Sequence, residues 1–338
     1  MKIIVTGGFG FLGSHLVKHL FKKYVGCTIL VVDSLTYAAN LGNLKGMAAK
    51  GYDFKFTKVS IADDYMYKVI KDFKPDVILN LAAQTHVDRS IRHPKEFVET
   101  DVVGTFNLVY WTTKLSVDKI FHISTDEVYG PIIKGEAKET NALSPTSPYA
   151  SSKAAADLLL LSYIKTYDFP ITIIRPTNNL GPNQYPEKLI PAVICRLLSG
   201  EKAFLHGEGK EIREWIYVED CCKAISGIMD KGKPQEIYNI GSGVRYSNKE
   251  VIYFIIKEMF GADAKFDDYV EYVPNRPGND FRYAVDSHKT LKLIGEYSTT
   301  SFHSGLRKTV NWYKRNKWFW ERSYKNIDAN IYTDEYLR

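Results

Sequence analysis

Residues 2–13, Lys-Ile-Ile-Val-Thr-Gly-Gly-Phe-Gly-Phe-Leu-Gly, decide the fold of this chain. The apolar stretch Lys2–Thr6 predicts a short buried strand, and residues 11–24 have the apolar periodicity of a helix. Three glycines mark the connection between the two elements: Gly7, Gly10 and Gly13. A strand, a glycine-rich turn and a helix in this order are typical of a βαβ unit that binds a dinucleotide pyrophosphate at the helix N-terminus.

An acidic residue follows at the distance that this interpretation requires. Asp33 ends the next apolar stretch, Thr28–Asp33, about 20 residues after Gly13. A carboxylate there binds the ribose hydroxyls of NAD and repels the 2′-phosphate of NADP. We therefore predict NAD as the cofactor, the alternative being a glycine loop that serves only as a turn.

The rest of the chain predicts an α/β fold in two parts. Up to residue 175, apolar strands alternate with helices, which indicates a Rossmann-type, doubly wound parallel sheet. The predicted strands are 54–59, 76–80, 119–124 and 171–175, and the predicted helices are 63–73, 94–115 and 148–167. Residues 1–175 are thus expected to form an NAD-binding domain that carries the catalytic residues. Residues 176–338 are expected to form a smaller α/β lobe, mainly for substrate binding and interwoven with the first part.

Composition indicates an ordinary globular protein. Of 338 residues, 45% are hydrophobic and 25% are charged, and the formal net charge is +6. The four cysteines have no metal-type spacing, the first strand leaves no room for a signal peptide, and no apolar run is long enough for a bilayer. We expect a cytoplasmic protein with no metal and no membrane contact. The basic, aromatic stretch 312–318 could bind nucleic acid, but we favour a helix with a solvated basic face.

Five side chains suggest the chemistry. Thr125, Asp126 and Glu127 follow an apolar strand, and Tyr149 and Lys153 lie four residues apart, on one face of a helix. We expect the Lys153 ammonium to lower the pKa of the Tyr149 phenol, so that a phenolate can take a proton from a substrate hydroxyl. An adjacent acid and base are what an elimination requires. The set indicates an enzyme that oxidises a sugar, eliminates water and reduces the product.

These motifs resemble those of the extended short-chain dehydrogenase/reductases, and among them the nucleotide-sugar 4,6-dehydratases that act on dTDP-glucose or UDP-glucose. The resemblance extends from residue 2 to about residue 315. It is carried by segments such as TGGFGFLG (6–13), DSLTYAANLGNL (33–44), AAQTHVDRS (82–90), STDEVYG (124–130), SPYASSKA (147–154), NNLGPNQYPEKLIP (178–191), GEGKEIREWIYVED (207–220), YNIGSG (238–243) and NRPGNDFRY (275–283).

The resemblance implies a role for each position. Thr125 would bind the sugar 4-hydroxyl, Tyr149 would remove its proton beside Lys153, Glu127 would remove the proton on carbon 5, and Asp126 would protonate the departing 6-hydroxyl. Cofactor contacts are expected from Gly7, Gly10, Phe11, Leu12, Gly13, Asp33, Ser34, Ile61, Ala82, Ala83, Tyr149 and Lys153. Substrate contacts are expected from His86, Thr125, Asn178, Asn179, Lys188, Leu189, His206, Arg213, Asn239 and Arg276. For Asn239 a buried structural role is an equal alternative, and His86 could instead be a core histidine.

Three positions differ from the family pattern. Ser60 and Asp101 stand where an Asp and an Asn are usual, and His206 stands where the dTDP enzymes usually have a Tyr. On the last difference we lean toward a uridine nucleotide, with glucose or N-acetylglucosamine as the sugar. The product could also leave as a 5,6-ene or with carbon 5 inverted.

Two other functions stay open. A nucleotide-sugar 4-epimerase would share Tyr149, Lys153 and NAD but would not need the Asp126-Glu127 pair. A non-catalytic binding protein on this fold should have lost part of the catalytic set. The resemblance further implies a homodimer through a four-helix bundle of helices 94–115 and 148–167, the alternative being core helices in a monomer.

Overall fold

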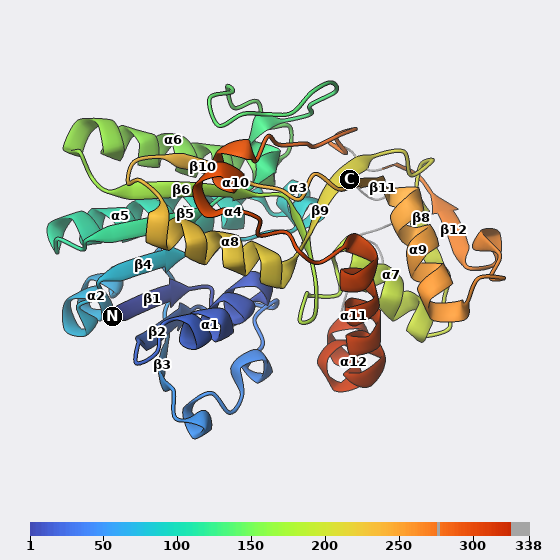
Figure 1. Cartoon of the computed structure of the whole chain (residues 1–338), viewed down its shortest axis with the longest axis horizontal. Helices are drawn as coiled ribbons and strands as arrows, with labels where there is room; N and C mark the ends of the chain where they lie inside the picture. Colours follow the sequence, from blue (N-terminus) through green and yellow to red (C-terminus); the bar gives the residue numbers. More distant parts are fainter. Residues whose placement is uncertain (276–277, 326–338) are drawn as a thin grey trace.

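The computed structural model describes residues 1–275 and 278–325 and contains a central parallel sheet, as expected (Figure 1). Its strand order is β10-β6-β5-β4-β1-β2-β3, and all neighbours are parallel. The strands are β1 (Lys2–Thr6), β2 (Thr28–Asp33), β3 (Asp53–Lys58), β4 (Val77–Asn80), β5 (Lys119–Ile123), β6 (Ile171–Pro176) and β10 (Ile237–Ile240). The order reverses between β1 and β4, so a crevice for a ligand is expected at the carboxyl ends of these strands.

Helices cover both faces of this sheet, which explains why its inner strands are mostly apolar, whereas β3 at the edge is largely exposed. One buried cluster joins the sheet to α1 (Phe11–Lys23) and α8 (Val218–Lys231), with α10 (His288–Ile294) packed beside them. A second cluster joins the opposite face to α2 (Met66–Phe73), α5 (Gly104–Lys114) and α6 (Pro148–Tyr167). Segments after residue 176 therefore supply β10 to the central sheet, and α8 and α10 to the helices on one of its faces.

The single helix predicted over 94–115 is wrong in one respect, because a wide turn interrupts it. The segment consists of α4 (Pro94–Phe97), the π-helix η3 (Val98–Val103) and α5. In η3 the side chain of Asp101 is fully buried and accepts hydrogen bonds from Gln84 N and Ser152 Oγ. These partners lie far away in the sequence, so helical periodicity could not reveal the extra turn.

The remaining elements form a smaller lobe beside the carboxyl ends of the sheet (Figure 1). Helices and short strands build the buried cluster of this lobe, and the sequence did not predict all of them. The elements of this lobe are β7 (Asn178–Leu180), α7 (Leu189–Leu198), β8 (Ala203–His206), β9 (Ile212–Tyr217), β11 (Arg245–Ser247), α9 (Asn248–Phe260), η5 (Phe266–Asp268), β12 (Val270–Val273), α11 (Phe302–Arg315) and α12 (Lys317–Lys325). In the first part of the chain, α3 (Val87–Arg92) and η4 (Asp126–Tyr129) pack against α6, and η1 (Leu41–Leu44) and η2 (Ala48–Lys50) lie between β2 and β3. β11, β9 and β7 form one small sheet, and β12 and β8 form another.

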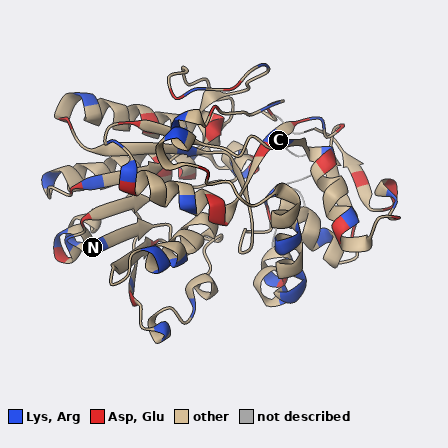
Figure 2. Ribbon diagram, in the orientation of Figure 1, with Lys and Arg blue, Asp and Glu red and all other residues tan. Residues whose placement is uncertain are grey.

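The basic, aromatic stretch lies in α11 and at the start of α12. Tyr313 is fully buried, and the ring of Trp312 packs edge-on against that of Phe319 at 4.8 Å. Trp312 and Tyr313 thus pack in the lobe's core, whereas Trp318 is 62% exposed. Over the ribbon as a whole, basic and acidic residues are interspersed (Figure 2). Among residues 1–275 and 278–325, every helix is too short or too polar to cross a bilayer.

Candidate functional site

A cavity opens at the carboxyl ends of the parallel strands, between the sheet and the smaller lobe. It is lined by nearly all of the residues that the sequence assigned to a site. These are Gly7, Gly10, Phe11, Leu12, Gly13, Asp33, Ser34, Ile61, Ala82, Ala83, His86, Thr125, Asp126, Glu127, Tyr149, Lys153, Asn178, Asn179, Lys188, Leu189, His206 and Arg213.

Two predicted contacts are not placed there. Asn239 is fully buried on β10 and does not line the cavity. Its side-chain oxygen accepts from the Tyr129 hydroxyl at 2.8 Å, and its side-chain nitrogen donates to Ala137 O and Asp286 O. The structural alternative therefore accounts for Asn239. Arg276 lies outside the described residues.

The glycine turn at one end of the cavity admits no side chain. Gly7 has a φ of +65°, in the left-handed region, and a Cβ on it would lie 2.9 Å from Ala82 N. A Cβ on Gly13 would lie 2.2 Å from Gly7 O. Because both obstacles are backbone atoms, these positions must be glycine if the turn is to stay close to α1 and β4. The N-terminus of α1 is thereby left open to a phosphate group.

Asp33 fixes the backbone at this end of the cavity by accepting two hydrogen bonds. Its Oδ2 accepts from Phe9 N at 2.9 Å and its Oδ1 accepts from Leu35 N at 2.8 Å. Burial raises the pKa of the carboxyl, and the two backbone hydrogen bonds oppose that rise. Because Asp33 also lines the cavity, its remaining lone pairs can accept from ribose hydroxyls.

Tyr149 and Lys153 project from the first turns of α6. Ser147 caps this helix by accepting from Ala150 N at 3.1 Å, and Pro148 occupies its first position, where no N–H donor is needed. Tyr149 is 8% exposed and Lys153 is 2% exposed. The Lys153 ammonium donates to Ile123 O at 2.8 Å, at the carboxyl end of β5.

The expected lowering of the Tyr149 pKa by Lys153 is wrong for this arrangement. Burial raises the pKa of Tyr149 well above its usual value, and the charges of Glu127, Asp101 and Asp126 raise it further. A hydrogen bond with Thr125 acts in the opposite direction. Asp126 and Glu127 were expected in this site, but neither the complete burial of the phenol nor the position of Asp101 could be inferred from the sequence, so the sign of the shift was not predicted.

The three residues after β5 form a compact acid–base group. Thr125 caps η4, its Oγ1 accepting from Glu127 N at 3.3 Å and lying 3.2 Å from Asp126 Oδ1. Asp126 is buried, and within the described residues its Oδ2 has no hydrogen-bond partner. Burial raises its pKa well above the usual value, Glu127 and Glu214 raise it further, and Arg213 opposes the rise. Burial and the neighbouring carboxyl groups thus favour the neutral form of Asp126, which is the form that a general acid requires.

A buried polar network connects α6, which carries Tyr149 and Lys153, to strands β5 and β6. Asp157 of α6 accepts from Arg175 Nε at 2.8 Å, and Arg175 Nη1 donates to the Tyr129 hydroxyl at 2.8 Å. His122 Nε2 lies 3.5 Å from the Lys153 ammonium. Burial lowers the pKa of His122 well below its usual value, so Lys153 faces a neutral imidazole.

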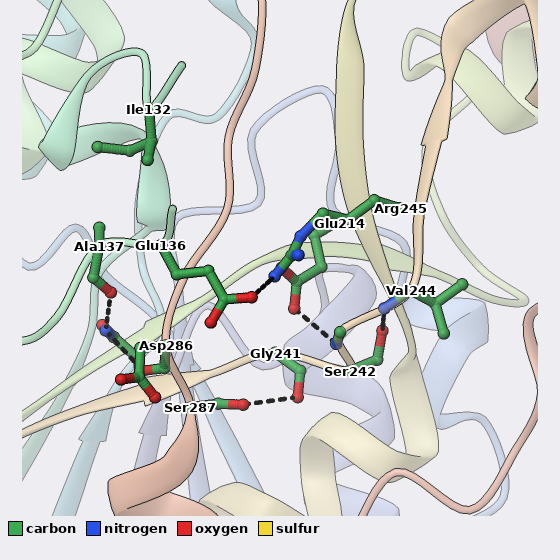
Figure 3. A network of polar contacts seen from close by, with 12 residues as sticks. Ile132, Glu136, Ala137, Glu214, Gly241, Ser242, Val244, Arg245, Asp286 and Ser287 are labelled. Atoms are coloured by element: carbon green, nitrogen blue, oxygen red, sulfur yellow. Dashed lines mark hydrogen bonds and ion pairs between the residues drawn. The ribbon is translucent and has the colours of Figure 1, made fainter. Parts of the chain in front are cut away.

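The smaller lobe contributes a cation to the other end of the cavity. Arg213 on β9 lines the cavity, whereas Glu214, its neighbour on the strand, is fully buried and binds Arg245 at 2.8 Å. Arg245 also binds Glu136 at 2.6 Å, so the three side chains tie β9 and β11 to the loop after η4 (Figure 3). Arg213 is thus held on a braced strand, where its guanidinium can bind phosphate oxygens.

Tyr283 is a cavity residue that the sequence reasoning missed. It is 4% exposed, and the Arg213 guanidinium lies 4.5 Å from the centre of its ring. The residue belongs to the segment 275–283, which was noted for its resemblance, but no periodic pattern marked the tyrosine.

Several buried polar atoms of the cavity wall have no partner among the described residues, which is the sign of a site built for a polar ligand. They include Asp126 Oδ2, Thr177 Oγ1, Asn178 Oδ1 and Gln184 Oε1. Together with the glycine turn and Asp33, they fit a dinucleotide and a polar second ligand side by side.

The chain is similar to known enzymes over nearly its whole length. The family model for GDP-mannose 4,6 dehydratase matches residues 4–309. A dTDP-glucose 4,6-dehydratase of Salmonella typhimurium is 38% identical, with 94% of this chain and 93% of the relative covered. The low-salt glycan biosynthesis protein Agl12 of Haloferax volcanii is 42% identical, with 93% and 98% covered.

Solved structures give the same result. A dTDP-glucose 4,6-dehydratase of Streptomyces venezuelae, crystallised with NAD bound, has a TM-score of 0.91 at 39% identity, covering 96% of this chain and 100% of that one. A UDP-glucose 4-epimerase of Thermotoga maritima has a TM-score of 0.85 at 30% identity, covering 94% and 100%. The chain belongs to the GDP-mannose 4,6 dehydratase family.

Proposed function

We propose that this protein is an NAD-dependent nucleoside-diphosphate-hexose 4,6-dehydratase. The observation that carries the proposal is the buried Asp126 beside Glu127, in the cavity that also holds Tyr149 and Lys153. An epimerase would have no use for an acid and a base at this point. The fold neighbours include both enzyme types, so the carboxyl pair, rather than the fold, decides between them.

The roles of the residues follow from their placement in the cavity. NAD would be held by the glycine turn and Asp33, and it would supply the hydride acceptor for carbon 4 of the hexose and the hydride donor for carbon 6. Tyr149, as the phenolate, takes the proton of the 4-hydroxyl, which Thr125 orients through a hydrogen bond; this phenolate is the minor form in the protein alone. The 4-keto group acidifies the proton on carbon 5, and Glu127 removes it as the base. Asp126 gives its proton to the 6-hydroxyl, which leaves as water. The resulting 5,6-alkene gains the hydride on carbon 6 and the proton held by Glu127 on carbon 5, which gives the 4-keto-6-deoxy sugar.

We propose dTDP-glucose as the preferred donor. Most of the similar proteins of known name are dTDP-glucose 4,6-dehydratases. This supports a thymidine nucleotide over the uridine nucleotide that His206 suggested. UDP-glucose and UDP-N-acetylglucosamine remain the donors to compare. Arg213 is expected to bind the diphosphate of each, because a guanidinium recognises phosphate oxygens whatever the base.

The test is an end-point assay of the purified protein with each of the three donors and no added reductant. Mass spectrometry should show that dTDP-glucose loses the mass of one water, and the Glu127→Gln variant should leave it unchanged. A product of unchanged mass but altered sugar stereochemistry would identify an epimerase instead. Conversion of a uridine donor alone would overturn the choice of nucleotide but not the reaction.

We also propose that two copies pair through α5 and α6, which lie side by side (Figure 1). Large apolar side chains stay exposed along these helices and the adjoining η3: Val103 (40%), Phe106 (43%), Tyr110 (36%) and Leu158 (58%). An apolar surface shared by two neighbouring helices is a typical protein interface. Phe106→Glu should halve the mass in solution, whereas Phe260→Glu, at an equally exposed (43%) phenylalanine of α9, should not. A monomeric wild type would refute the pairing.

A further inference from the structure

The cavity continues past Arg213 into the smaller lobe, and the chemistry proposed above does not use this part. Its walls come from α7, β8 and α12, which lie on the far side of β9 from the central sheet (Figure 1). On β8, Phe204 and His206 face the cavity, whereas the alternate residues Ala203 and Leu205 belong to the lobe's core. Because the hexose must lie at the catalytic group and the diphosphate at Arg213, the nucleoside of a donor is expected in this part.

Helix α12 brings an aromatic ring to this wall. The helix lies after residue 309, the last residue that the family model matches. Phe319 and Trp320 are buried in the lobe's core and anchor the helix. Tyr324 follows Trp320 by one helical turn, packs edge-on against its ring at 6.2 Å and lines the cavity. No motif in the sequence marked Tyr324 as a site residue.

A short series of contacts fixes the position of the Tyr324 ring. Its hydroxyl donates to Glu201 Oε2 at 2.7 Å. The same carboxylate oxygen lies 3.2 Å from Arg196 Nη2. The Arg196 guanidinium lies 3.6 Å from the centre of the Phe204 ring. One carboxylate therefore joins cavity residues of α12, α7 and β8.

The hydrogen bond to Glu201 determines what Tyr324 can offer a ligand. Burial raises the pKa of the Tyr324 phenol, the hydrogen bond to Glu201 raises it further, and Arg196 opposes the rise. The hydroxyl thus keeps its proton and gives it to the Glu201 carboxylate. What remains for a ligand is the aromatic ring, and a flat ring binds another planar ring by stacking.

The position of α12 is fixed by contacts with both parts of the chain. Trp320 Nε1 donates to Tyr313 O at 2.9 Å, and the Tyr313 hydroxyl donates to the backbone oxygen of the cavity residue Gln184. Trp318 lies against η1, where a Cβ on Gly42 would be 3.0 Å from Trp318 Cη2. The tyrosine of this helix is therefore in place before a ligand binds, which lowers the entropy cost of binding.

We propose that Tyr324 is a substrate-binding residue whose ring stacks on the nucleobase of the donor and is positioned for this by Glu201. The proposal rests on the proposed function, because the place of the nucleoside follows from a hexose at the catalytic group. Loss of one base–aromatic stack weakens binding by about 5- to 150-fold. Since every base has an aromatic face, Tyr324 contributes affinity and leaves the choice between thymine and uracil to other residues.

Two substitutions separate the ring from the hydroxyl. Tyr324→Leu removes the ring and keeps an apolar side chain on α12, whereas Tyr324→Phe keeps the ring and removes the hydrogen bond to Glu201. Tyr272→Leu is the matched control on β12 of the same lobe. Tyr272 is 55% exposed, its hydroxyl also donates to a carboxylate, Asp267 Oδ1 at 3.0 Å, and it lies outside the described lining of the cavity. Thermal unfolding of each variant checks that the lobe is folded.

The first readout is the binding of dTDP and UDP to the NAD-loaded protein, measured by calorimetry, and it needs no turnover. Tyr324→Leu should raise both Kd values by about 5- to 150-fold, Tyr324→Phe should raise them less, and Tyr272→Leu should leave them unchanged. Unchanged Kd values in Tyr324→Leu, or a wild type that binds neither nucleotide, would overturn the proposal. So would equal losses in Tyr324→Leu and Tyr324→Phe, or a loss for only one of the two bases.

A measurement on the wild type decides the matter if Tyr324→Leu does not fold. Uridine diphosphate that carries iodine on its uracil ring forms a covalent bond with a stacked aromatic side chain on irradiation. Peptide mass spectrometry should then find the nucleotide on Tyr324. Attachment at other residues but not at Tyr324 would overturn the proposal.

The second readout is the steady-state rate with the donor that the protein dehydrates. In Tyr324→Leu, kcat/KM should fall by the factor by which Kd rises, through a higher KM. A fall in kcat at unchanged KM would indicate a structural effect and overturn the binding role. If no donor is dehydrated, the proposed function fails, and the binding of dTDP and UDP still decides the role of Tyr324.

Discussion

Asp126 and Asp157 are both buried aspartates, and their replacement by asparagine is expected to have opposite consequences. Asp126→Asn should leave the fold intact and stop elimination. Asp157→Asn should destabilise the fold. The contrast depends on the charge of each group in the folded protein, which the structure determines.

The magnitudes follow from the partners. Asp157 accepts from the buried Arg175 at 2.8 Å, and Arg175 and Lys153 oppose the effect of burial on its pKa. Removing one partner of a buried ion pair costs roughly 3–5 kcal/mol. Burial favours the neutral form of Asp126, so an amide of the same shape should change the free energy of unfolding by less than about 1 kcal/mol.

In catalysis the larger effect is expected from Asp126→Asn, because Asp126 is the proposed general acid and Asp157 is not. Loss of a general acid lowers the rate of its step by about 10²–10⁴-fold, which is an increase of roughly 3–5.5 kcal/mol in the barrier. Asp126→Asn should still oxidise carbon 4, because Tyr149 and Lys153 are unchanged. Reduced cofactor should therefore accumulate after mixing with the donor, and its absorbance can be followed in a stopped-flow instrument.

Urea unfolding at pH 7 measures the first effect and the product yield measures the second, with Asp72→Asn, at a solvent-exposed carboxylate of α2, as the control in both. If Asp126→Asn destabilised the fold as much as Asp157→Asn, Asp126 would be a carboxylate and the assigned acid role would fail. Elimination at the wild-type rate in Asp126→Asn would refute the role directly.

Three further predictions concern the base, the cofactor turn and the buried carboxyl of η3. Tyr149→Phe should lower turnover by about 10²–10⁴-fold while the NAD content of the purified protein stays the same, since the phenol is needed for proton transfer rather than for the glycine turn; an active variant would exclude Tyr149 as the base. Gly13→Ala should abolish NAD retention, measured in the denatured protein, because its Cβ would lie 2.2 Å from Gly7 O; a variant that keeps NAD would show that the turn can move. The pKa of Asp101 is raised from 3.8 to about 6, so its contribution to stability is complete below about pH 4 and is lost as the pH rises through 6. The unfolding free energy of wild type should therefore fall relative to Asp101→Asn by on the order of 3 kcal/mol between pH 4 and 7, and parallel curves would contradict the raised pKa.

Local sequence was sufficient for the sheet and for the cofactor end of the site. Strands β1, β2 and β6 and helix α6 follow from apolar runs and helical periodicity, and the glycine turn with Asp33 follows from spacing along one βαβ unit. These features involve neighbours in sequence. The order of the strands was not predicted, because the reversal at β1 and the addition of β10 beside β6 depend on how distant segments pack.

The smaller lobe was predicted with less detail for a physical reason. Its strands β7, β8, β9, β11 and β12 have three to six residues each and pair with distant segments, so they carry little periodic signal. Tyr283 belongs to the cavity because its ring lies against the guanidinium of Arg213, a residue from a distant segment of the chain. The sequence indicated that a substrate segment exists but not which of its side chains turn inward.

The sequence by itself determined the Rossmann-type sheet and the dinucleotide turn, and it predicted which residues serve as the acid, the base, the phenol and the ammonium. The tertiary structure decided their protonation. Tyr149 was expected to be acidified by Lys153, yet the folded chain surrounds it with Glu127, Asp101 and Asp126 and removes it from water. A pKa depends on the burial of a group and on every charge within a few ångströms, and these are set by segments that meet only when the chain is folded.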